Sequence, residues 1–290
     1  MLVNMMNDGQ VRLGTSGWNY PDWRGSFYPD GLKPEEYLEF YARHWPTVEV
    51  DCSFYDIPTA AMLKSWDRRT PAGFGFTLKV PRVITHERKL VDCSGVVAAF
   101  LNATDALGDK RWCAVLQFGY FPPTVFANVR EFLERLGPFL ASWPVERCPI
   151  AVEVRNAGWI NGRLGKVLRD HQAGLVLSDH VGLPPPWVVA NWFDPATGPV
   201  TLCRLLGDRE GIEQITTTWE KRVLDRSPAL DEVAKVLEGL ADRTRVLVYA
   251  ANHYEGHSPE TLTRLAQRLG PRVAGPAPSD QPPRRLTLFE

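Results

Sequence analysis

Short runs of apolar or alternating apolar and polar residues recur along the chain, separated by longer segments in which apolar residues return every three or four positions. Runs of the first kind are typical of β-strands, and segments of the second kind are typical of α-helices. The expected strands cover residues 11–17, 47–55, 75–81, 112–118, 150–155, 175–179, 200–206 and 245–251. The expected helices cover residues 34–44, 60–69, 92–107, 123–136, 160–171, 228–240 and 259–269.

Strands that alternate with helices predict a parallel sheet. In a chain of 290 residues, eight such strands are expected to close into one (β/α)8 barrel of the TIM type, here over residues 1–270. A doubly wound open sheet is the alternative. The Pro- and Trp-rich stretch GLPPPWVVANWFDPATGP is interpreted as a connection without a helix between the sixth and seventh strands.

Residues 271–290 differ from the rest of the chain, because they are Pro-rich and show no apolar periodicity. They are expected to form a flexible tail that ends in a short apolar peptide. The net charge of −1 gives no global reason to expect a nucleic acid or a membrane as partner. No apolar run approaches the ~20 residues of a membrane span, and the first residues, MLVNMMNDGQ, do not resemble a signal peptide.

The cysteines are scattered and form no CxxC pair. Three of them, Cys52, Cys113 and Cys203, lie within apolar runs. This pattern predicts buried free thiols in a reducing compartment, and we therefore expect a cytoplasmic protein.

Strand parity points to charged residues inside the barrel, because alternate residues of a barrel strand face the interior. Val48 and Val50 are apolar and are expected to face the helices, so Glu49 and Asp51 point inward. The same argument places further polar residues near the ends of the strands, where barrel active sites lie: Lys79, Gln117, Glu153, Arg155, Asp179, Arg204, Asn252 and His253. An ion-pair network that merely fills the barrel is the alternative.

A long aromatic loop follows the first strand and reads GTSGWNYPDWRGSFYPD over residues 14–30. Its rings are too apolar to leave in water, so a structured loop at the mouth of a site is expected. The segment KVPRVITHERK, residues 79–89, is the one local basic run and leads toward the same mouth. Cations beside aromatic rings suit a nucleic-acid strand; a solvated loop is the alternative.

The densest polar cluster is NHYEGH, residues 252–257. Its two histidines are four positions apart with Glu255 between them, which is not the HExxH arrangement of zinc enzymes. We expect a loop that contacts substrate, and a divalent metal held by mouth carboxylates and histidines remains an alternative.

Several stretches together resemble the YecE-like family, a domain of unknown function (DUF72). They are GTSGWNYPDWRGSFYP, VEVDCSFYDIPT, FTLKVPRVITHERKL, AVEVRNAGW and NHYEGHSPE. The resemblance implies a TIM-like barrel, similar to the xylose-isomerase and endonuclease-IV type, and implies no particular reaction. Asp51 stands where the family usually has asparagine, and Leu206 stands where a histidine is expected.

The last residues resemble the short peptide by which bacterial DNA-processing proteins dock on the replication sliding clamp. Leu286, Leu288 and Phe289 would be the docking side chains, while Arg285 replaces the usual glutamine. The alternative is that these residues pack on the barrel itself.

The first functional hypothesis is an enzyme that acts on a nucleic acid or another phosphate ester in an aromatic and basic mouth. The candidate catalytic residues are Asp51, Glu153, Asp179, His253 and Glu255. The candidate substrate-binding residues are Trp18, Tyr20, Trp23, Tyr55, Lys79, Arg82, His86, Gln117, Arg155, Arg204, Asn252 and Tyr254. The alternatives are a carbohydrate isomerase or hydrolase, favoured by a neutral or acidic mouth, and a non-catalytic module that binds DNA or the clamp.

Overall fold

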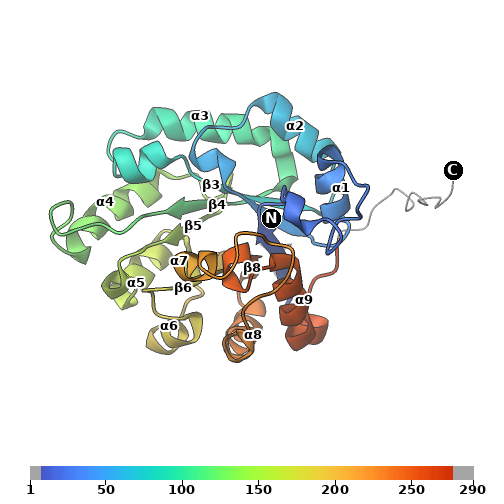
Figure 1. Cartoon of the computed structure of the whole chain (residues 1–290). Helices are drawn as coiled ribbons and strands as arrows, with labels where there is room; N and C mark the ends of the chain where they lie inside the picture. Colours follow the sequence, from blue (N-terminus) through green and yellow to red (C-terminus); the bar gives the residue numbers. More distant parts are fainter. Residues whose placement is uncertain (1–7, 277–290) are drawn as a thin grey trace.

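Eight parallel strands close into a barrel in the order of the sequence, in a computed structural model that describes residues 8–276 (Figure 1). The strands are β1 (Val11–Ser16), β2 (Thr47–Val50), β3 (Gly75–Lys79), β4 (Arg111–Gln117), β5 (Ile150–Glu153), β6 (Gly174–His180), β7 (Val200–Gly207) and β8 (Arg245–Ala250). Each expected strand is found, and β8 pairs with β1 to complete the ring. The expected (β/α)8 barrel is therefore confirmed.

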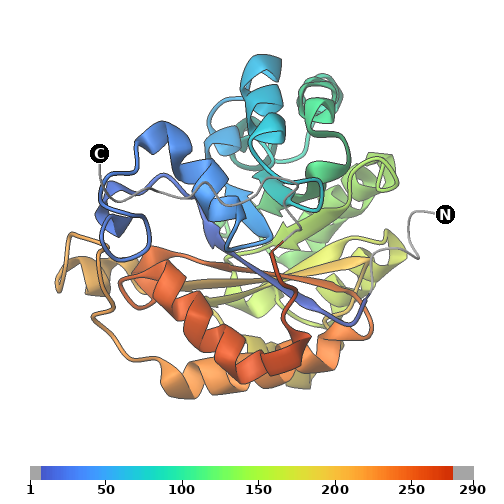
Figure 2. The same ribbon diagram turned by 90° about the vertical axis from the view of Figure 1, so that its right-hand side faces the viewer.

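Helices surround the barrel, as Figures 1 and 2 show. They are α1 (Tyr37–Ala42), α2 (Ala60–Arg68), α3 (Ser94–Thr104), α4 (Val129–Ser142), α5 (Gly162–Asp170), α6 (Pro186–Trp192), α7 (Arg209–Glu213), α8 (Ser227–Ala241) and α9 (Ser258–Leu269). Short 3-10 turns follow several strands, and a π-helix, Val83–Glu87, follows β3.

Three helices differ from the expectation, and one of them, the short α7, was not expected at all. The helix predicted over 123–136 begins at Val129, because the Asn128 side chain accepts hydrogen bonds from the backbone N–H groups of Arg130 and Glu131 and caps the helix there. The Pro-rich connection contains α6, which was not expected. The helix begins at Pro186. Proline is tolerated in the first turn because the backbone N–H groups there have no acceptor within the helix.

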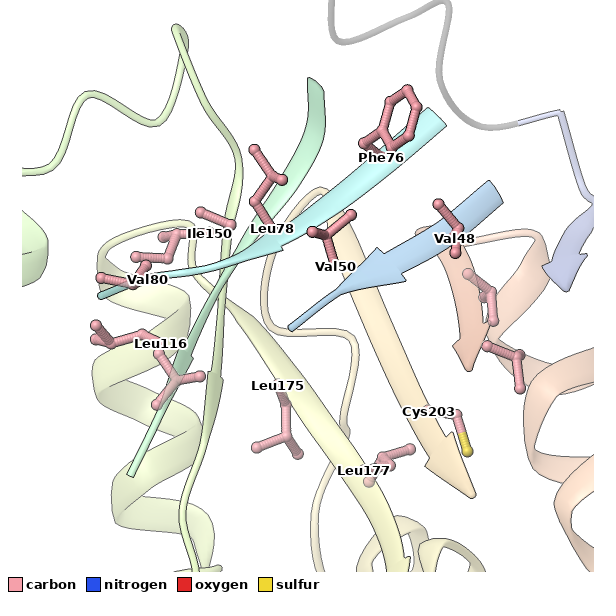
Figure 3. Close-up of a cluster of buried hydrophobic side chains, with 14 of the residues drawn as sticks. Val48, Val50, Phe76, Leu78, Val80, Leu116, Ile150, Leu175, Leu177 and Cys203 are labelled. Carbon is pink, nitrogen blue, oxygen red and sulfur yellow. The ribbon is translucent and has the colours of Figure 1, made fainter. Parts of the chain in front are cut away.

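The outer core lies between the strands and the helices. Figure 3 shows side chains of this layer, among them Val48 of β2, Leu78 of β3, Leu116 of β4 and Leu177 of β6. Together with the helix faces these residues form the main hydrophobic core, and their burial supplies most of the driving force for folding.

The interior of the barrel is filled by a second, smaller core. It contains Trp112, Val115, Leu202 and Tyr249, all nearly inaccessible to solvent. The Tyr249 hydroxyl lies 2.9 Å from Thr47 Oγ1 and 2.6 Å from Thr77 Oγ1, so its polar end is satisfied inside the barrel. The barrel is therefore a packed structure, and polar side chains collect above this layer, at the carboxyl ends of the strands.

β1 and β2 approach each other unusually closely at Gly14. A Cβ atom at this position would lie 2.1 Å from the backbone oxygen of Thr47. Only glycine fits there, so the register of the first two strands depends on this residue.

One thiol departs from the expectation of buried cysteines. Cys93, Cys113, Cys148 and Cys203 are buried, but Cys52 is exposed. β2 ends at Val50, and a 3-10 turn begins at Cys52, so this residue lies outside the buried strand that its apolar neighbours suggested. Within residues 8–276, no helix is long and apolar enough to cross a membrane. Leu286, Leu288 and Phe289 lie outside the described residues.

Candidate functional site

A buried arginine bridges two buried glutamates inside the carboxyl end of the barrel. Arg204 of β7 donates from Nε and Nη2 to Glu49 Oε2, at 3.2 and 2.8 Å, and from Nη1 to Glu153 Oε2 at 2.6 Å. The three side chains are at most 3% exposed. Strand parity places Glu49 of β2 and Glu153 of β5 inward, as expected.

Further donors complete the shell of these carboxylates. Arg155 Nη2 lies 2.8 Å from Glu153 Oε1, and Ser178 donates to the same oxygen at 3.0 Å. Ser16 at the end of β1 donates to Glu49 Oε2 at 2.8 Å. The network therefore joins residues from strands around the ring, which holds the carboxylates rigidly.

The electrostatics keep Glu153 ionised. Burial alone would raise the pKa of Glu153, but Arg204, Arg155 and Lys79 outweigh it and lower that pKa to about 2. Burial also disfavours the charged form of Arg204, yet Glu49 and Glu153 raise its pKa overall. Glu153 is therefore an anion at neutral pH that can accept hydrogen bonds but cannot serve as a proton donor.

A second ion pair lies nearer to solvent. Lys79 Nζ, at the end of β3, lies 2.9 Å from Asp51 Oδ1, which is also 4.0 Å from Arg204 Nη2. The Asp51 side chain is 48% exposed, whereas that of Lys79 is 11% exposed. Asp51 is thus the carboxylate of the network that an incoming molecule can reach.

The network is electrically balanced, since it joins the carboxylates of Glu49, Asp51 and Glu153 to the cations Lys79, Arg155 and Arg204. We call these six residues the charged floor. Three of its buried atoms, Glu49 Oε1, Asp51 Oδ1 and Arg155 Nε, have no hydrogen-bond partner in the described structure. Buried polar atoms are normally paired, so a water molecule or a ligand group is expected beside them.

Aromatic residues of the loop after β1 lie beside the charged floor. Tyr20 donates from its hydroxyl to the Ser16 carbonyl at 2.7 Å. Burial, assisted by the charges of Asp51 and Glu49, raises the pKa of Tyr20 to about 12. Trp18 is half-buried and packs edge-on against Trp66, with ring centroids 5.3 Å apart. Tyr20 therefore lies beside the charged floor, whereas the contact of Trp18 is with α2.

A second group of rings follows β2, β3 and β4. Lys79 Nζ lies 5.6 Å from the centre of the Phe54 ring. Phe54 packs edge-on against Tyr55 at 5.3 Å and against His86 at 5.2 Å. Burial and the cations Arg82 and Lys79 lower the pKa of His86, so its imidazole is neutral at neutral pH. Tyr55 is 69% exposed.

Trp23 is a core residue and does not line the mouth. Its side chain is fully buried, and its Nε1 donates to Asn252 Oδ1 at 3.2 Å. The Asn252 oxygen also accepts from the hydroxyl of Ser258 at 2.7 Å. These two candidates therefore join the first loop to the start of α9, and the expectation that Trp23 stacks on a substrate is wrong.

Asp179 lies on the outer face of β6. Its neighbour Ser178 points inward to Glu153, so alternation turns Asp179 toward the helices, where it accepts a hydrogen bond from the Tyr254 hydroxyl at 2.7 Å. The inward placement was wrong because the run Leu175–Leu177 is apolar on both faces, so it carried no parity signal. Ser178 is the residue of β6 that faces the mouth, and the sequence analysis did not identify it.

Glu255 is enclosed by structural partners. Its side chain is fully buried, pairs with Arg264, and accepts from the backbone N–H of Arg226 at 2.9 Å and from the hydroxyl of Thr261 at 2.9 Å. It therefore fastens the loop after β8 to α8 and α9 and does not face the mouth. A glutamate between two histidines looks the same in the sequence whether it binds a substrate or stabilises the fold.

The remaining candidates occupy the rim. His253 lies 3.5 Å from Glu213 and packs edge-on against Trp219, and burial lowers its pKa. Arg82 is exposed and pairs with Glu87 at 3.2 Å. Gln117 is half-buried at the end of β4, opposite Glu153 of β5. His180, one of the strand-tip histidines considered as a metal ligand, has a pKa that is lowered by burial and by the nearby charge of Arg155.

The described residues contain no group of three or more His, Cys, Asp or Glu side chains arranged to hold a metal ion. A groove of about 590 Å³ lies on the outer surface between α3 and α4, lined in part by Cys93, Phe139 and Trp143. No residue of the charged floor lines that groove.

Comparisons with known proteins identify relatives of the whole barrel. Residues 12–286 match the model of the family described as "Protein of unknown function DUF72". The UPF0759 protein YunF of Bacillus subtilis (strain 168) is 35% identical over 162 residues, which are 52% of this chain and 52% of that protein. The UPF0759 protein YecE of Escherichia coli (strain K12) is 31% identical over 146 residues, or 50% and 48% of the two chains. The chain thus spans about half the length of these curated relatives.

Solved structures share the fold. A DUF72 family protein from Thermotoga maritima is 24% identical, with a TM-score of 0.69 over 89% of this chain and 97% of that chain. Another from Enterococcus faecalis is 20% identical, with a TM-score of 0.67 over 94% and 100%. A psychrophilic glycoside hydrolase family 10 endo-beta-1,4-xylanase is 11% identical, with a TM-score of 0.51 over 84% and 88%; this likeness concerns the fold alone. The expected resemblance to YecE is confirmed, and the chain belongs to the DUF72 family of proteins of unknown function.

Proposed function

We propose that the mouth of the barrel binds a small, neutral, polyhydroxylated molecule of the carbohydrate class and exchanges protons with it. The observation that carries this proposal is the charged floor, in which three carboxylates and three cations balance beneath aromatic walls. Hydroxyl groups both donate and accept hydrogen bonds, so they can meet carboxylates and cations side by side. Aromatic rings suit the apolar faces of sugars.

The charge balance favours this class over phosphate esters. Binding sites for phosphate present cations that are free to pair with it. Here Arg204 is committed to Glu49 and Glu153, and Lys79 is paired with Asp51. A phosphate group would have to displace these buried or half-buried carboxylates, whereas a hydroxyl can add to the network without displacing a charge.

Asp51 and Lys79 are the residues proposed to move protons. Asp51 is half exposed and its carboxylate lies 2.9 Å from the Lys79 ammonium. A carboxylate and an ammonium in this arrangement can take a proton from one substrate position and give one to another. Glu153 remains ionised with a pKa of about 2 and would stabilise positive charge or accept hydroxyl hydrogen bonds.

A phosphate-bearing ligand, including a nucleotide or a nucleic-acid strand, is the second candidate. It is favoured by one specific observation, because Arg155 Nε is buried beside the mouth without a hydrogen-bond partner. Arg155 Nε could therefore donate a hydrogen bond to an anion while Arg155 Nη2 remains paired with Glu153.

The experiment is a binding and conversion panel. Calorimetry measures binding of neutral monosaccharides, the matching sugar phosphates and a single-stranded oligonucleotide, and NMR follows chemical change in each sugar. We expect wild type to bind and convert at least one neutral sugar. Asp51→Asn should still bind this sugar but lose conversion. Asp56→Asn is the matched control, because Asp56 is exposed in the same loop, and it should behave as wild type.

The opposite selectivity would contradict the proposal. Binding restricted to phosphate-bearing ligands, weakening steeply as salt concentration rises, would favour the second candidate. Equal conversion by Asp51→Asn and wild type would remove Asp51 from the proposed role.

A further inference from the structure

The large apolar side chains that remain exposed are concentrated at the mouth. Of the seven such residues in the described structure, five lie in segments that follow strands: Tyr55 after β2, Val91 after β3, Tyr120 after β4, Val181 after β6 and Ile215 beyond β7 and α7. Parallel strands place all these loops at one end of the barrel. Exposed apolar side chains gathered in one region are typical of binding surfaces.

Two of these residues, Tyr55 and Tyr120, flank a row of packed rings. Tyr55 packs against Phe54, and Phe54 packs against His86. A Cβ atom added at Gly119 would lie 3.1 Å from His86 Nε2, so the imidazole lies directly against the backbone that precedes Tyr120. We call Phe54, Tyr55, His86 and Tyr120 the aromatic strip. It crosses the loops after β2, β3 and β4, which are neighbours in the barrel.

The aromatic strip begins at the charged floor and ends in solvent. Lys79 Nζ lies 5.6 Å from the centre of the Phe54 ring. At the outer end, the Tyr55 and Tyr120 side chains are 69% and 68% exposed. A ligand that occupies only the charged floor would leave both of these rings unused.

The three loops that carry the aromatic strip have no net formal charge. Residues 51–56, 79–92 and 117–123 contain four basic and four acidic residues, so their formal charges cancel. Two of the pairs are direct, Lys79 with Asp51 and Arg82 with Glu87. A polyanion gains affinity from excess positive charge along its path, and these loops offer none.

We propose that the aromatic strip is a set of subsites for a carbohydrate chain, so that the ligand of this mouth is a linear oligosaccharide. One sugar unit lies over the charged floor, and the following units stack on the exposed faces of Tyr55 and Tyr120. This inference rests on the proposed function and specifies its substrate class.

The test is the dependence of affinity on chain length. The probes are glucose and xylose, and their β-1,4-linked disaccharides and tetrasaccharides, with Kd measured by calorimetry. For wild type we expect the tetrasaccharide of at least one series to bind more tightly than its monosaccharide. Tyr55→Ala and Tyr120→Ala should each weaken tetrasaccharide binding by about two- to tenfold and leave monosaccharide binding unchanged. Trp192→Ala is the matched control, because Trp192 is 56% exposed at the end of α6, and it should match wild type throughout.

Three results would overturn the inference. Equal affinity of wild type for monosaccharides and tetrasaccharides would refute the proposal that the aromatic strip provides subsites, and it would leave the proposed function standing. Failure of every sugar to bind would refute both. Salt-sensitive binding of a single-stranded oligonucleotide that is lost in Tyr55→Ala and Tyr120→Ala would assign the strip to nucleic acid instead.

Discussion

Replacing Arg204 with methionine tests whether the charged floor is held together by one bridging cation. Arg204 donates to both Glu49 and Glu153, and all three side chains are buried. Methionine fills much of the same volume without charge or donors. The variant therefore keeps most of the packing but leaves two buried carboxylates without their shared partner.

The expected loss of stability follows from the pKa of Glu153. Its value falls from the usual 4.5 to about 2 in the folded protein, which corresponds to about 3 kcal/mol at neutral pH. Removing one member of a buried ion pair typically costs about 3–5 kcal/mol. Both arguments predict that Arg204→Met lowers the free energy of unfolding by about 3 kcal/mol or more.

The pH dependence of stability should also become weaker. In wild type the pKa of Glu153 is lower in the folded than in the unfolded state. Its contribution is therefore fully present above pH 4.5 and is lost as the pH falls toward about 2. In Arg204→Met, Glu153 loses one of the cations that lower its pKa. This contribution should shrink, so the variant should lose less stability than wild type as the pH falls from about 4.5 toward 2.

Urea denaturation followed by Trp fluorescence, at neutral pH and near pH 3, measures both effects. The control is Arg209→Met, which removes an exposed Arg209–Glu213 pair and should cost less than about 1 kcal/mol. The reasoning would be refuted if Arg204→Met lost no more stability than this control, or if its pH dependence matched wild type.

Two further predictions concern single residues of the fold. A thiol-specific reagent should modify one cysteine per chain in the native protein, and Cys52→Ser should abolish that reaction, because Cys52 is exposed and the other cysteines are buried; rapid modification of a second thiol would contradict this. Gly14→Ala should lower the free energy of unfolding by more than about 3 kcal/mol, since its Cβ would lie 2.1 Å from the Thr47 carbonyl oxygen. Gly31→Ala is the control with open space around the added Cβ, and similar melting temperatures of the two variants would argue against the close approach of β1 and β2.

The site could be predicted where strand parity was visible. Alternating strands placed Glu49 and Glu153 inward, and the structure has both there. In β6 the run Leu175–Leu177 is apolar on both faces, so Asp179 was placed inward while Ser178 holds that position. Parity was absent there because a parallel strand is buried on both faces.

Residues in loops were predicted less well, because their roles depend on neighbours distant in the sequence. Trp23 and Asn252 are hydrogen-bonded across 229 positions. Glu255 is enclosed by α8 and α9, although its sequence neighbourhood resembles a polar site. Neither arrangement leaves a local pattern that distinguishes a core residue from a binding residue.

The sequence by itself determined the eight strands, most of the helices and the barrel, because each strand and helix follows from the periodicity of one segment. It also contained the family motifs, because each motif is a short pattern within one segment. Only the tertiary structure decided which charges meet. Arg204 reaches Glu49 across 155 positions and Glu153 across 51, and closure of the barrel brings the three together. Pairing then fixed the ionisation of Arg204 and Glu153, because the energy of a buried charge depends on the distance to its partner and on the exclusion of water. The balance of the charged floor, and with it the class of ligand proposed here, is therefore a property of the closed barrel.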